Sequence, residues 1–309
     1  MENQFDVISI GSATVDIFIE SKDFIITPEI IGLKPSSKNE VSQSLICSGG
    51  GATNSAVSFT RLGLKSAPVS LVGASHLNQY IFDDLKKAKV YDQFIYTDKK
   101  DITDFSVIIV PKGGKRSILT NRGQSYLQSK NISWSKIKKT KWFYITSLEG
   151  NLDLLETTIG FAKENNIKIA LNPGRRELQN RPQLTPLVKM VDFLLLNREE
   201  AQNLFNQSLD DIIDNNLIHQ INIPVVAVTA GAKGAYIFSD NRQFFSPAAN
   251  KKPIDETGAG DAFGSTFVAG LIHQKSPQEA LHWAVKNSAS VVSQLGSKPG
   301  LLTLKQIIN

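Results

Sequence analysis

Short apolar runs alternate with amphipathic stretches along most of this chain. The amphipathic stretches carry apolar residues at helical spacing, and clear examples are residues 52–63, 151–166 and 198–205. The apolar runs are typical of strands, and those from residue 141 onward are nearly continuous, as expected of strands buried on both faces. They cover residues 5–11, 67–73, 141–148, 167–173, 191–197 and 224–230. This repetition predicts an α/β fold, a doubly wound and mostly parallel sheet with helices on both sides.

Two segments break this rhythm and predict a small β-rich lid. Residues 15–47 hold two β-like runs with no convincing helix between them, and residues 104–120 are typical of two strands joined by a Gly-Gly turn. A lid suits an enzyme that must exclude water. The alternative is an extension of the edge of the main sheet. Because no linker divides the chain, we expect residues 1–309 to form a single domain that carries the lid.

The composition is that of an ordinary globular protein, with 309 residues of which 41% are hydrophobic and 20% are charged. The net charge is +5, but the lysines are scattered beside turn residues, so we expect a solvated surface and no nucleic-acid partner. No apolar run approaches the roughly 18 residues that a membrane span needs. Cys47 is the only cysteine, and no basic region precedes an apolar one at the start of the chain. These features favour a cytoplasmic protein without a membrane partner.

The stretch "DETGAGDAF" at residues 255–263 carries the clearest chemical signal. Gly258, Ala259 and Gly260 stand where a helical pattern begins, so their backbone N–H groups are free and lie at the positive end of the helix dipole. Without bulky side chains an anion can approach these amides closely. Asp261, in the same turn, is placed to take a proton from a hydroxyl that attacks a phosphoryl group. The alternative is a glycine-rich turn whose acidic residue only stabilises the helix.

Five motifs together resemble those of the ribokinase-like (PfkB) carbohydrate kinase family. Residues 255–261 fill its pattern D-x-T-G-A-G-D, and the others follow in the family's order from about residue 5 to residue 304. They are "GSATVD" at 11–16, "SGGGATNSAVSFTRLG" at 48–63, "LLLNREEA" at 194–201 and "VTAGAKGAYIF" at 228–238. The resemblance implies a doubly wound α/β domain with a β lid and the ATP-dependent phosphorylation of a hydroxyl.

The resemblance also implies roles for individual residues. Asp261 is expected to be the general base, and Gly258, Ala259 and Gly260 are expected to form the anion hole for the transferred group. The other expected sites are Asp16, Gly50, Asn54 and Glu149 for the substrate, Asn197, Thr229, Gly231, Gly234 and Asn287 for the nucleotide, and Glu200 and Asp255 for metal.

Several of these residues have plainer alternatives. Asp16 alone is typical of a turn, Asn197 of a helix N-cap, and Asn287 of a helix surface. Gly231 and Gly234 could form an ordinary hairpin turn. The expected cofactors are ATP and Mg²⁺, with K⁺ near Asp255 implied by part of the family.

Two departures from the family pattern leave the phosphate acceptor open. Many of its sugar kinases have G-G-K-G-A-N at the N-terminal glycine motif, but residues 49–54 contain no lysine, and Thr14 replaces a frequent asparagine. A small sugar and a nucleoside both remain candidates, and we expect the sugar to be favoured. Arginines such as Arg116 could bind a substrate phosphate or lie on the surface. A monomer and a homodimer that pairs through lid strands also stay open.

Other enzyme classes lack their signatures. The chain has no G-x-x-x-x-G-K-[ST] phosphate loop, no G-x-G-x-x-G after the first strand and no G-x-S-x-G elbow. Its four histidines show no metal-ligand spacing. A non-catalytic ligand-binding relative of the kinases is the remaining alternative, and the presence of Asp261 with its glycines argues against it.

Overall fold

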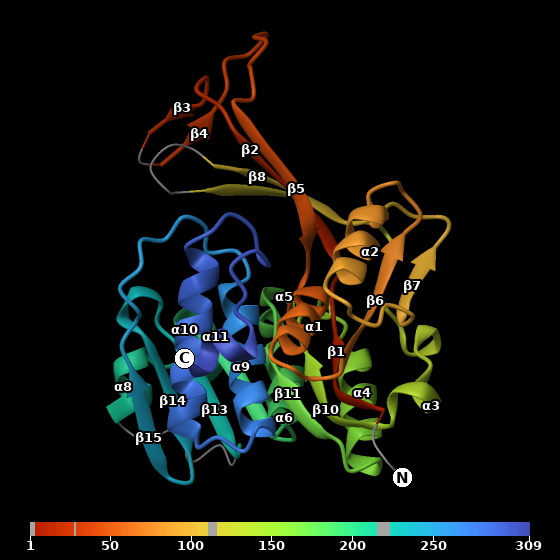
Figure 1. The fold of residues 1–309 in the computed structure, drawn as a ribbon, viewed down its shortest axis with the longest axis vertical. Helices are drawn as coiled ribbons and strands as arrows, with labels where there is room; N and C mark the ends of the chain where they lie inside the picture. The colour runs from red at the N-terminus through yellow and green to blue at the C-terminus, as the bar shows by residue number, and fades with distance from the viewer. Residues whose placement is uncertain (1–3, 28, 111–115, 215–222) are drawn as a thin grey trace.

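The computed structural model describes residues 4–27, 29–110, 116–214 and 223–309, and these residues form a nine-stranded central sheet. The sheet runs in the order β15-β14-β13-β12-β11-β10-β1-β6-β7, parallel from β13 to β7, with β14 and β15 antiparallel at one edge (Figure 1). Its strands are β1 (Phe5–Ile10), β6 (Ser66–Gly73), β7 (Ile95–Asp98), β10 (Thr140–Ile145), β11 (Lys168–Leu171), β12 (Phe193–Asn197), β13 (Val225–Thr229), β14 (Ala235–Ser239) and β15 (Arg242–Ser246). All six strands expected in this sheet are therefore confirmed, within a few residues of their predicted bounds.

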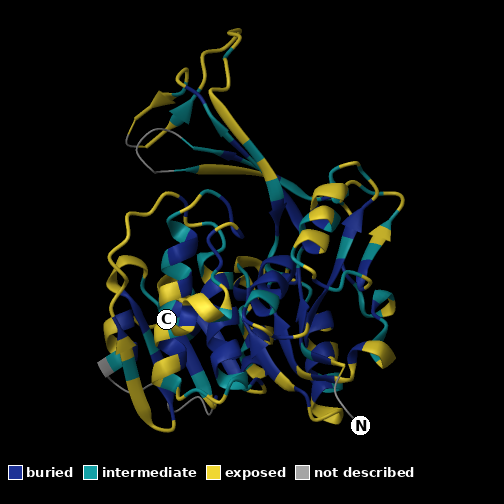
Figure 2. Ribbon diagram, in the orientation of Figure 1, coloured by how far each residue is buried: buried dark blue, intermediate teal, exposed yellow. Residues whose placement is uncertain are grey.

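Helices cover both faces of the sheet, because successive strand residues point to opposite sides. On β10, Phe143 joins the buried cluster that contains residues of α4, whereas Tyr144 joins the one that contains residues of α9. The first face carries α3 (Trp134–Ile137), α4 (Leu152–Glu164), α5 (Arg175–Gln179), α6 (Arg181–Val188), α7 (Arg198–Phe205) and α8 (Leu209–Asp214). The second carries α1 (Gly51–Arg61), α9 (Ala259–Ile272), α10 (Pro277–Val292) and α11 (Leu304–Ile308). Figure 2 shows the buried residues gathered in the sheet and in the inner sides of these helices, so the predicted doubly wound fold is confirmed.

A second, four-stranded sheet stands above the main one (Figure 1). It has the order β5-β2-β8-β9 and consists of β2 (Thr14–Glu20), β5 (Gln43–Gly49), β8 (Phe105–Ile109) and β9 (Ser117–Asn121). Two short strands, β3 (Ile25–Ile26) and β4 (Ile31–Gly32), pair near its tip. The predicted lid segments supply this sheet, which is separate from the main sheet and not an extension of its edge. The predicted Gly-Gly turn of the lid lies outside the described residues.

The lid begins directly at the carboxyl end of the central strand β1. Only residues 11–13 separate β1 from β2, and β5 ends one residue before α1 (Gly51–Arg61). Thr14 and Gly49 are paired at the root of the lid. A third buried cluster fills the space between the lid root, α1 and α2 (Asn78–Lys87). The lid and the carboxyl edge of the sheet therefore share their first residues.

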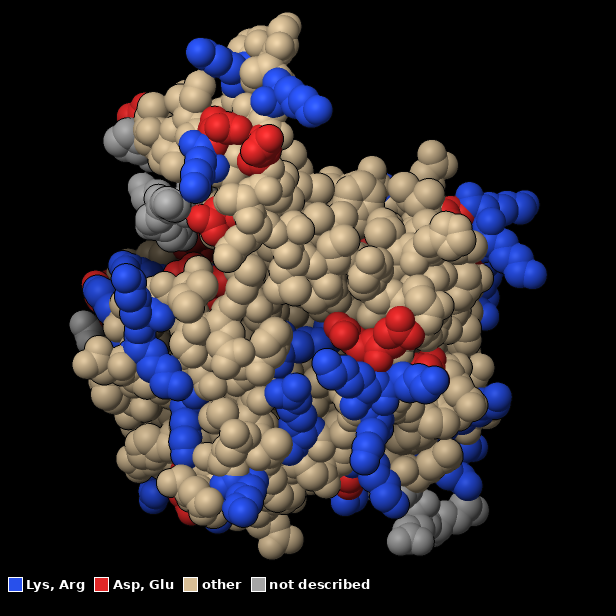
Figure 3. Space-filling view, turned by 45° about the horizontal axis from the view of Figure 1, so that its top comes forward, with Lys and Arg blue, Asp and Glu red and all other residues tan. Residues whose placement is uncertain are grey.

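The surface charges follow the pattern expected from the sequence. Figure 3 shows Lys and Arg side chains spread over one face of the molecule, with a smaller group of acidic side chains among them. In the part of the chain that the model describes, no helix is both long enough and apolar enough to cross a bilayer.

Candidate active site

The GAGD stretch forms the start of the 14-residue helix α9. Gly258 is its N-cap with a φ of 77°, and a Cβ atom there would lie 2.5 Å from the Cβ of Ser297, so only glycine fits. Around Gly260, by contrast, a Cβ atom would meet no atom within 4 Å. The N–H groups of Gly260 and Asp261 have no acceptor in the described part of the chain. The turn thus has the open, amide-lined character that binds an anion.

Asp261 is held by an asparagine from the other end of the chain. Asn54 Nδ2 donates to Asp261 Oδ2 at 2.8 Å, and Ser297 Oγ donates to Asn54 Oδ1 at 2.8 Å. Burial raises the pKa of the Asp261 carboxyl, while the Asn54 hydrogen bond and the charge of Lys298 partly lower it. A carboxylate with a raised pKa beside free amides has the properties of a general base next to an anion hole.

Asp255 orders the turn that precedes α9. Its Oδ1 accepts from Thr257 N at 3.0 Å and from Thr257 Oγ1 at 2.7 Å, and its Oδ2 accepts from Gly296 N at 3.0 Å. Arg116, beside the lid strand β9, forms an ion pair with the same carboxylate. The side chain is 2% exposed and has donors on both oxygens. The metal role of Asp255 stays a prediction, and the structure gives this carboxylate a different set of partners.

The predicted substrate residues of the N-terminal half meet at the root of the lid. Asp16, on β2, is buried, and a Cβ atom on Gly49 would lie 2.1 Å from its Oδ2. Gly50 has a φ of 92°, and a Cβ atom there would lie 2.5 Å from Ser12 O. Burial raises the pKa of Asp16, and the Lys298 charge opposes this effect. Asp16 therefore lies on β2, and Gly50 follows the paired strand β5 and leads into α1, the helix that carries Asn54.

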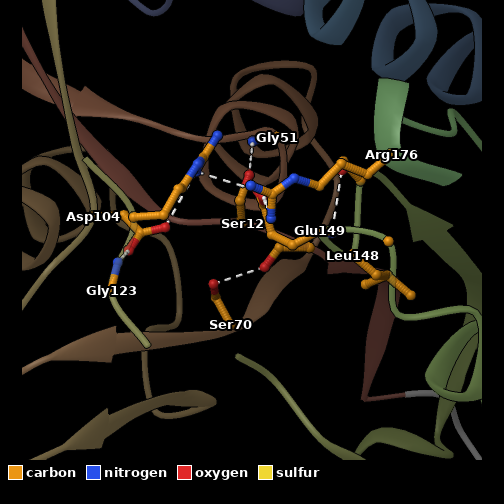
Figure 4. A network of polar contacts seen from close by, with 12 residues as sticks. Ser12, Gly51, Ser70, Asp104, Gly123, Leu148, Glu149 and Arg176 are labelled. Carbon is orange, nitrogen blue, oxygen red and sulfur yellow. Dashed lines mark hydrogen bonds and ion pairs between the residues drawn. The ribbon is translucent and has the colours of Figure 1, made fainter. Parts of the chain in front are cut away.

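Glu149 lies at the carboxyl edge of the sheet, in the left-handed region with a φ of 60°. Arg122 Nη1 lies 3.2 Å from its Oε1, and Arg176 Nη1 lies 3.6 Å from its Oε2 (Figure 4). Burial raises the pKa of Glu149, and the two arginines lower it. The residue lines a small cavity of about 50 Å³ together with Ser12 and Ser70. The substrate role of Glu149 stays a prediction, and the structure places the residue in a cavity beside the end of β1.

Asn197 and Glu200 form a capping box at the start of α7. Asn197 Oδ1 accepts from Glu200 N at 2.9 Å, and Glu200 Oε2 accepts from Asn197 N at 2.8 Å. The plainer alternative for Asn197, an N-cap, is therefore present. Burial raises the pKa of Glu200. No group of three or more His, Cys, Asp or Glu among the described residues could hold a metal ion, so a divalent ion here would depend on phosphate oxygens and water.

The predicted nucleotide residues on neighbouring strands lie side by side. Thr229 ends β13 and is paired with Asn197 at the end of β12. Gly231 and Gly234 bound a single 3₁₀ turn after β13, with φ values of 56° and 109°. A Cβ atom on Gly234 would lie 2.2 Å from Ser246 O. A Cβ atom on Gly231 would have no atom within 4 Å. Gly234 thus serves the close approach of β15, and Gly231 leaves open space at the same edge.

The hydrogen bonds of Asn287 connect it to Thr266 and Leu302, which are not part of this strand edge. It is fully buried in α10, and its amide donates to Thr266 Oγ1 at 2.7 Å and accepts from Leu302 N at 2.8 Å. The sequence alternative, a helix-surface amide, is wrong because these partners draw the side chain inward. The nucleotide role of Asn287 stays a prediction, and in this structure its amide joins α10 to α9 and to the segment before α11.

Two site residues carried no signal in the sequence. Ser297 bonds Asn54, and the neighbouring Lys298 is a buried lysine that bonds the segment before α1. Neither residue belongs to a motif, because their roles depend on partners more than 240 residues away. Glycine spacing could have indicated that this segment approaches the site, since Gly296 and Gly300 flank the pair.

Comparisons with known proteins identify the family and the fold of this chain. A family model described as pfkB family carbohydrate kinase matches residues 4–304. Ribokinase from Haemophilus influenzae is 26% identical over 269 residues, which cover 85% of this chain and 87% of that protein. Ribokinase from Arabidopsis thaliana, solved with ribose and ATP, gives a TM-score of 0.81 at 18% identity and covers 100% of this chain and 98% of its own. Adenosine kinase from Sinorhizobium meliloti gives 0.81 at 22% identity, with 99% and 98% covered. At these identities the two solved structures establish the fold alone.

Proposed function

The chain belongs to the pfkB family of carbohydrate kinases, and on this premise we propose that it transfers a phosphoryl group from ATP to a hydroxyl of a small sugar, with Asp261 as the general base. The observation that carries the proposal is the hydrogen bond between Asn54 and Asp261 at an amide-lined helix start. It joins a buried carboxylate, the free amides of a helix start and a buried asparagine in one group of contacts. Phosphoryl transfer needs this kind of positioning more than it needs covalent help.

The reaction assigns a distinct task to each group. Asp261 accepts the proton of the attacking hydroxyl, and the N–H groups at the start of α9 stabilise the charge on the transferred group. Asp16 accepts hydrogen bonds from neighbouring sugar hydroxyls, and Asn54 keeps Asp261 oriented. When bound, Mg²⁺ neutralises charge on the phosphates. The edge that carries Thr229 and Gly231 is open for the nucleotide.

A substrate panel tests the proposal. ADP release is measured with ribose, fructose, adenosine, cytidine and inosine, and kcat/KM is compared across the panel. We expect a sugar to be phosphorylated best. Asp16→Ala should abolish turnover of that sugar, because the variant lacks the carboxylate that accepts hydrogen bonds from the sugar hydroxyls. A tenfold or greater preference for any nucleoside would replace the sugar by a nucleoside in the proposal. An Asp16→Ala variant with unchanged kcat/KM would remove Asp16 from the substrate site.

We also propose that the lid pairs with the lid of a second copy. Residues aligned across the four lid strands form one apolar row, which runs Ile46, Ile17, Val107 and Leu119. Its outer members, Ile46 and Leu119, are 38% and 60% exposed. Such a row is self-complementary about a two-fold axis, as in an isologous interface, and pairing would cover it.

The mass in solution tests this second proposal. We expect a dimer by light scattering and a monomer for Leu119→Lys, because the charge would be buried against an apolar row. Thr120→Lys is the matched control, since Thr120 is exposed on the opposite side of the same strand. A monomeric unaltered protein, or two variants with the same mass, would rule the lid out as the interface.

A further inference from the structure

A lysine is buried directly behind the candidate active site. Lys298 is 7% exposed, and its Nζ donates to Ser48 O at 2.8 Å, to Ser48 Oγ at 2.8 Å and to Thr53 Oγ1 at 3.1 Å. All three donors of the ammonium group are therefore used on neutral oxygens. No carboxylate in the described part of the chain lies within ion-pair distance of it. Burying a charge is costly unless it is paired and hydrogen-bonded, and this ammonium has hydrogen bonds but no ion pair.

The groups that face Lys298 are mostly acidic. Asp84 on α2, Asp16 on β2 and Asp261 on α9 each favour its charged form. The fourth group is the Cys47 thiol on β5, whose pKa burial raises to about 12, so it is neutral at ordinary pH. Burial in turn lowers the pKa of Lys298 to about 8. The ammonium is thus the positive charge that offsets Asp16 and Asp261, the two reacting-site carboxylates whose pKa it lowers.

Lys298 also fixes the backbone that carries the site. The adjacent Ser297 bonds Asn54, while Lys298 bonds Thr53 and Ser48, so two consecutive residues hold both ends of the turn at residues 48–54. Asp84 holds the same turn from the other side, because its Oδ2 accepts from Ser48 N at 3.1 Å and from Ser48 Oγ at 2.7 Å. The turn contains Gly50 and leads to the asparagine that orients Asp261.

We propose that Lys298 is a positioning residue that acts as the fixed internal cation of the site: it aligns the turn at residues 48–54 with the start of α9 and offsets the buried carboxylates, so that the polyanionic nucleotide can bind there. Without this charge, three acids would face the entering phosphates unopposed by it, and their repulsion would weaken binding. The inference rests on the proposed kinase activity, so its test includes nucleotide binding measured without an acceptor.

Substitutions of Lys298 separate its charge from its packing. Lys298→Met keeps the side-chain length and removes the charge, and we expect kcat/KM for ATP to fall roughly 100-fold, as when one partner of a buried charge group is removed. The dissociation constant of a non-hydrolysable ATP analogue, measured by calorimetry, is expected to rise at least tenfold. The control is Lys286→Met, because Lys286 is an exposed lysine that bonds only the carbonyl of Ile307, at 3.2 Å. Equal values for the two variants would overturn the proposal.

Small amines provide a test that packing alone cannot pass. Lys298→Ala leaves a space lined by Ser48 O, Ser48 Oγ and Thr53 Oγ1, which can accept hydrogen bonds from an added cation. We expect ammonium or methylammonium chloride to raise the activity of Lys298→Ala at least tenfold. Tetramethylammonium chloride at the same ionic strength has no N–H donors and is not expected to restore any. Equal recovery with all three salts, or no recovery with any, would refute the assigned role.

The pH dependence of the unaltered sequence gives a test that needs no Lys298 variant to fold. As the pH rises through about 8, Lys298 loses its proton, so affinity for the ATP analogue is expected to fall. Asp84→Asn removes a charge that favours the ammonium, so this fall is expected at lower pH. A flat profile, or a profile that Asp84→Asn does not move, would overturn the inference. If the protein binds the analogue as expected but phosphorylates no acceptor, the proposed function fails and the role in nucleotide binding stands.

Discussion

Replacing Asp261 by asparagine exchanges one carboxylate oxygen for an amide nitrogen, and we expect this change to reduce catalysis without reducing stability. The amide oxygen of the new residue can still accept the hydrogen bond that Asn54 donates at 2.8 Å, so the local geometry has a reason to persist. The amide has no basicity near neutral pH and cannot take the proton of the acceptor hydroxyl. We therefore expect kcat to fall by about 10² to 10⁴, the usual contribution of a general base.

The same substitution should not destabilise the fold. Burial is the main cause that raises the pKa of Asp261, so at pH 7 the ionised side chain is less favourable in the folded protein than in the unfolded chain. This penalty is absent below the ordinary pKa of an aspartate, grows as the pH rises from there to the folded pKa, and is constant above the folded pKa. Asparagine has no such charge to bury. We expect the Tm at pH 7 to be unchanged or to rise by about 2 °C, which corresponds to about 1 kcal/mol.

The assay measures turnover and thermal unfolding for Asp261→Asn and for one matched control variant. ADP release is measured at saturating ATP and sugar, and Tm is measured at pH 7. Asp153→Asn is the control, because Asp153 also lies in the first turn of a helix, α4, but is exposed. It should keep full kcat and lose about 0.3–1 kcal/mol through the helix dipole. If Asp261→Asn behaves in the same way as Asp153→Asn, the acid only stabilises its helix and the base assignment is wrong.

Three further predictions concern other residues of the candidate site. Asn54→Ala should move the acid limb of the kcat/KM profile to higher pH, because the hydrogen bond from Asn54 lowers the pKa of Asp261 and the variant lacks it; an unmoved limb would contradict this. Glu200→Gln should raise the Mg²⁺ concentration for half-maximal activity without a change in Tm, since glutamine can preserve the capping box; an unchanged requirement would exclude a metal role. Arg116→Ala should raise the KM for the sugar about three- to fivefold by removing the ion pair between the lid region and Asp255, and an unaltered KM would show that this pair does not assist closure.

The strands of the main sheet were predictable where burial was complete on both faces. β10, β11 and β12 appear in the sequence as apolar runs, because parallel strands covered by helices admit few polar residues. β15 gave no such signal: it is an edge strand, and most of its residues are exposed. The lid strands were recognisable as β-like runs with no helix between them, but the row that aligns Ile17 with Leu119 depends on a register that the sequence does not specify.

The candidate site was predictable where glycine was required and hidden where polar side chains were buried. The glycines at 258 and 50 adopt positive φ values and approach backbone or side-chain atoms closely, which is why their motifs are recognisable. Asn287 and Lys298 have side chains that are usually exposed. Their burial is compensated by partners such as Thr266 and Ser48, and no local pattern reports a partner that is brought close only by the fold.

The hydrogen bond between Asn54 and Asp261 spans 207 residues, and this distance sets an order of events during synthesis. At typical rates of 5–20 residues per second, α1 leaves the ribosome about 10 to 40 s before α9, the helix that carries Asp261. Through that interval the polar face of α1 must stay hydrated, because the partners of Asn54 and Ser58 on α9 do not yet exist: Asp261, which accepts from Asn54, and Ser265, which donates to Ser58. The apolar face of α1 can meanwhile settle on β1 and β6. The site is therefore completed only once α9 has been made, so a ribosome-bound chain that lacks α9 carries no assembled site with which to consume nucleotide.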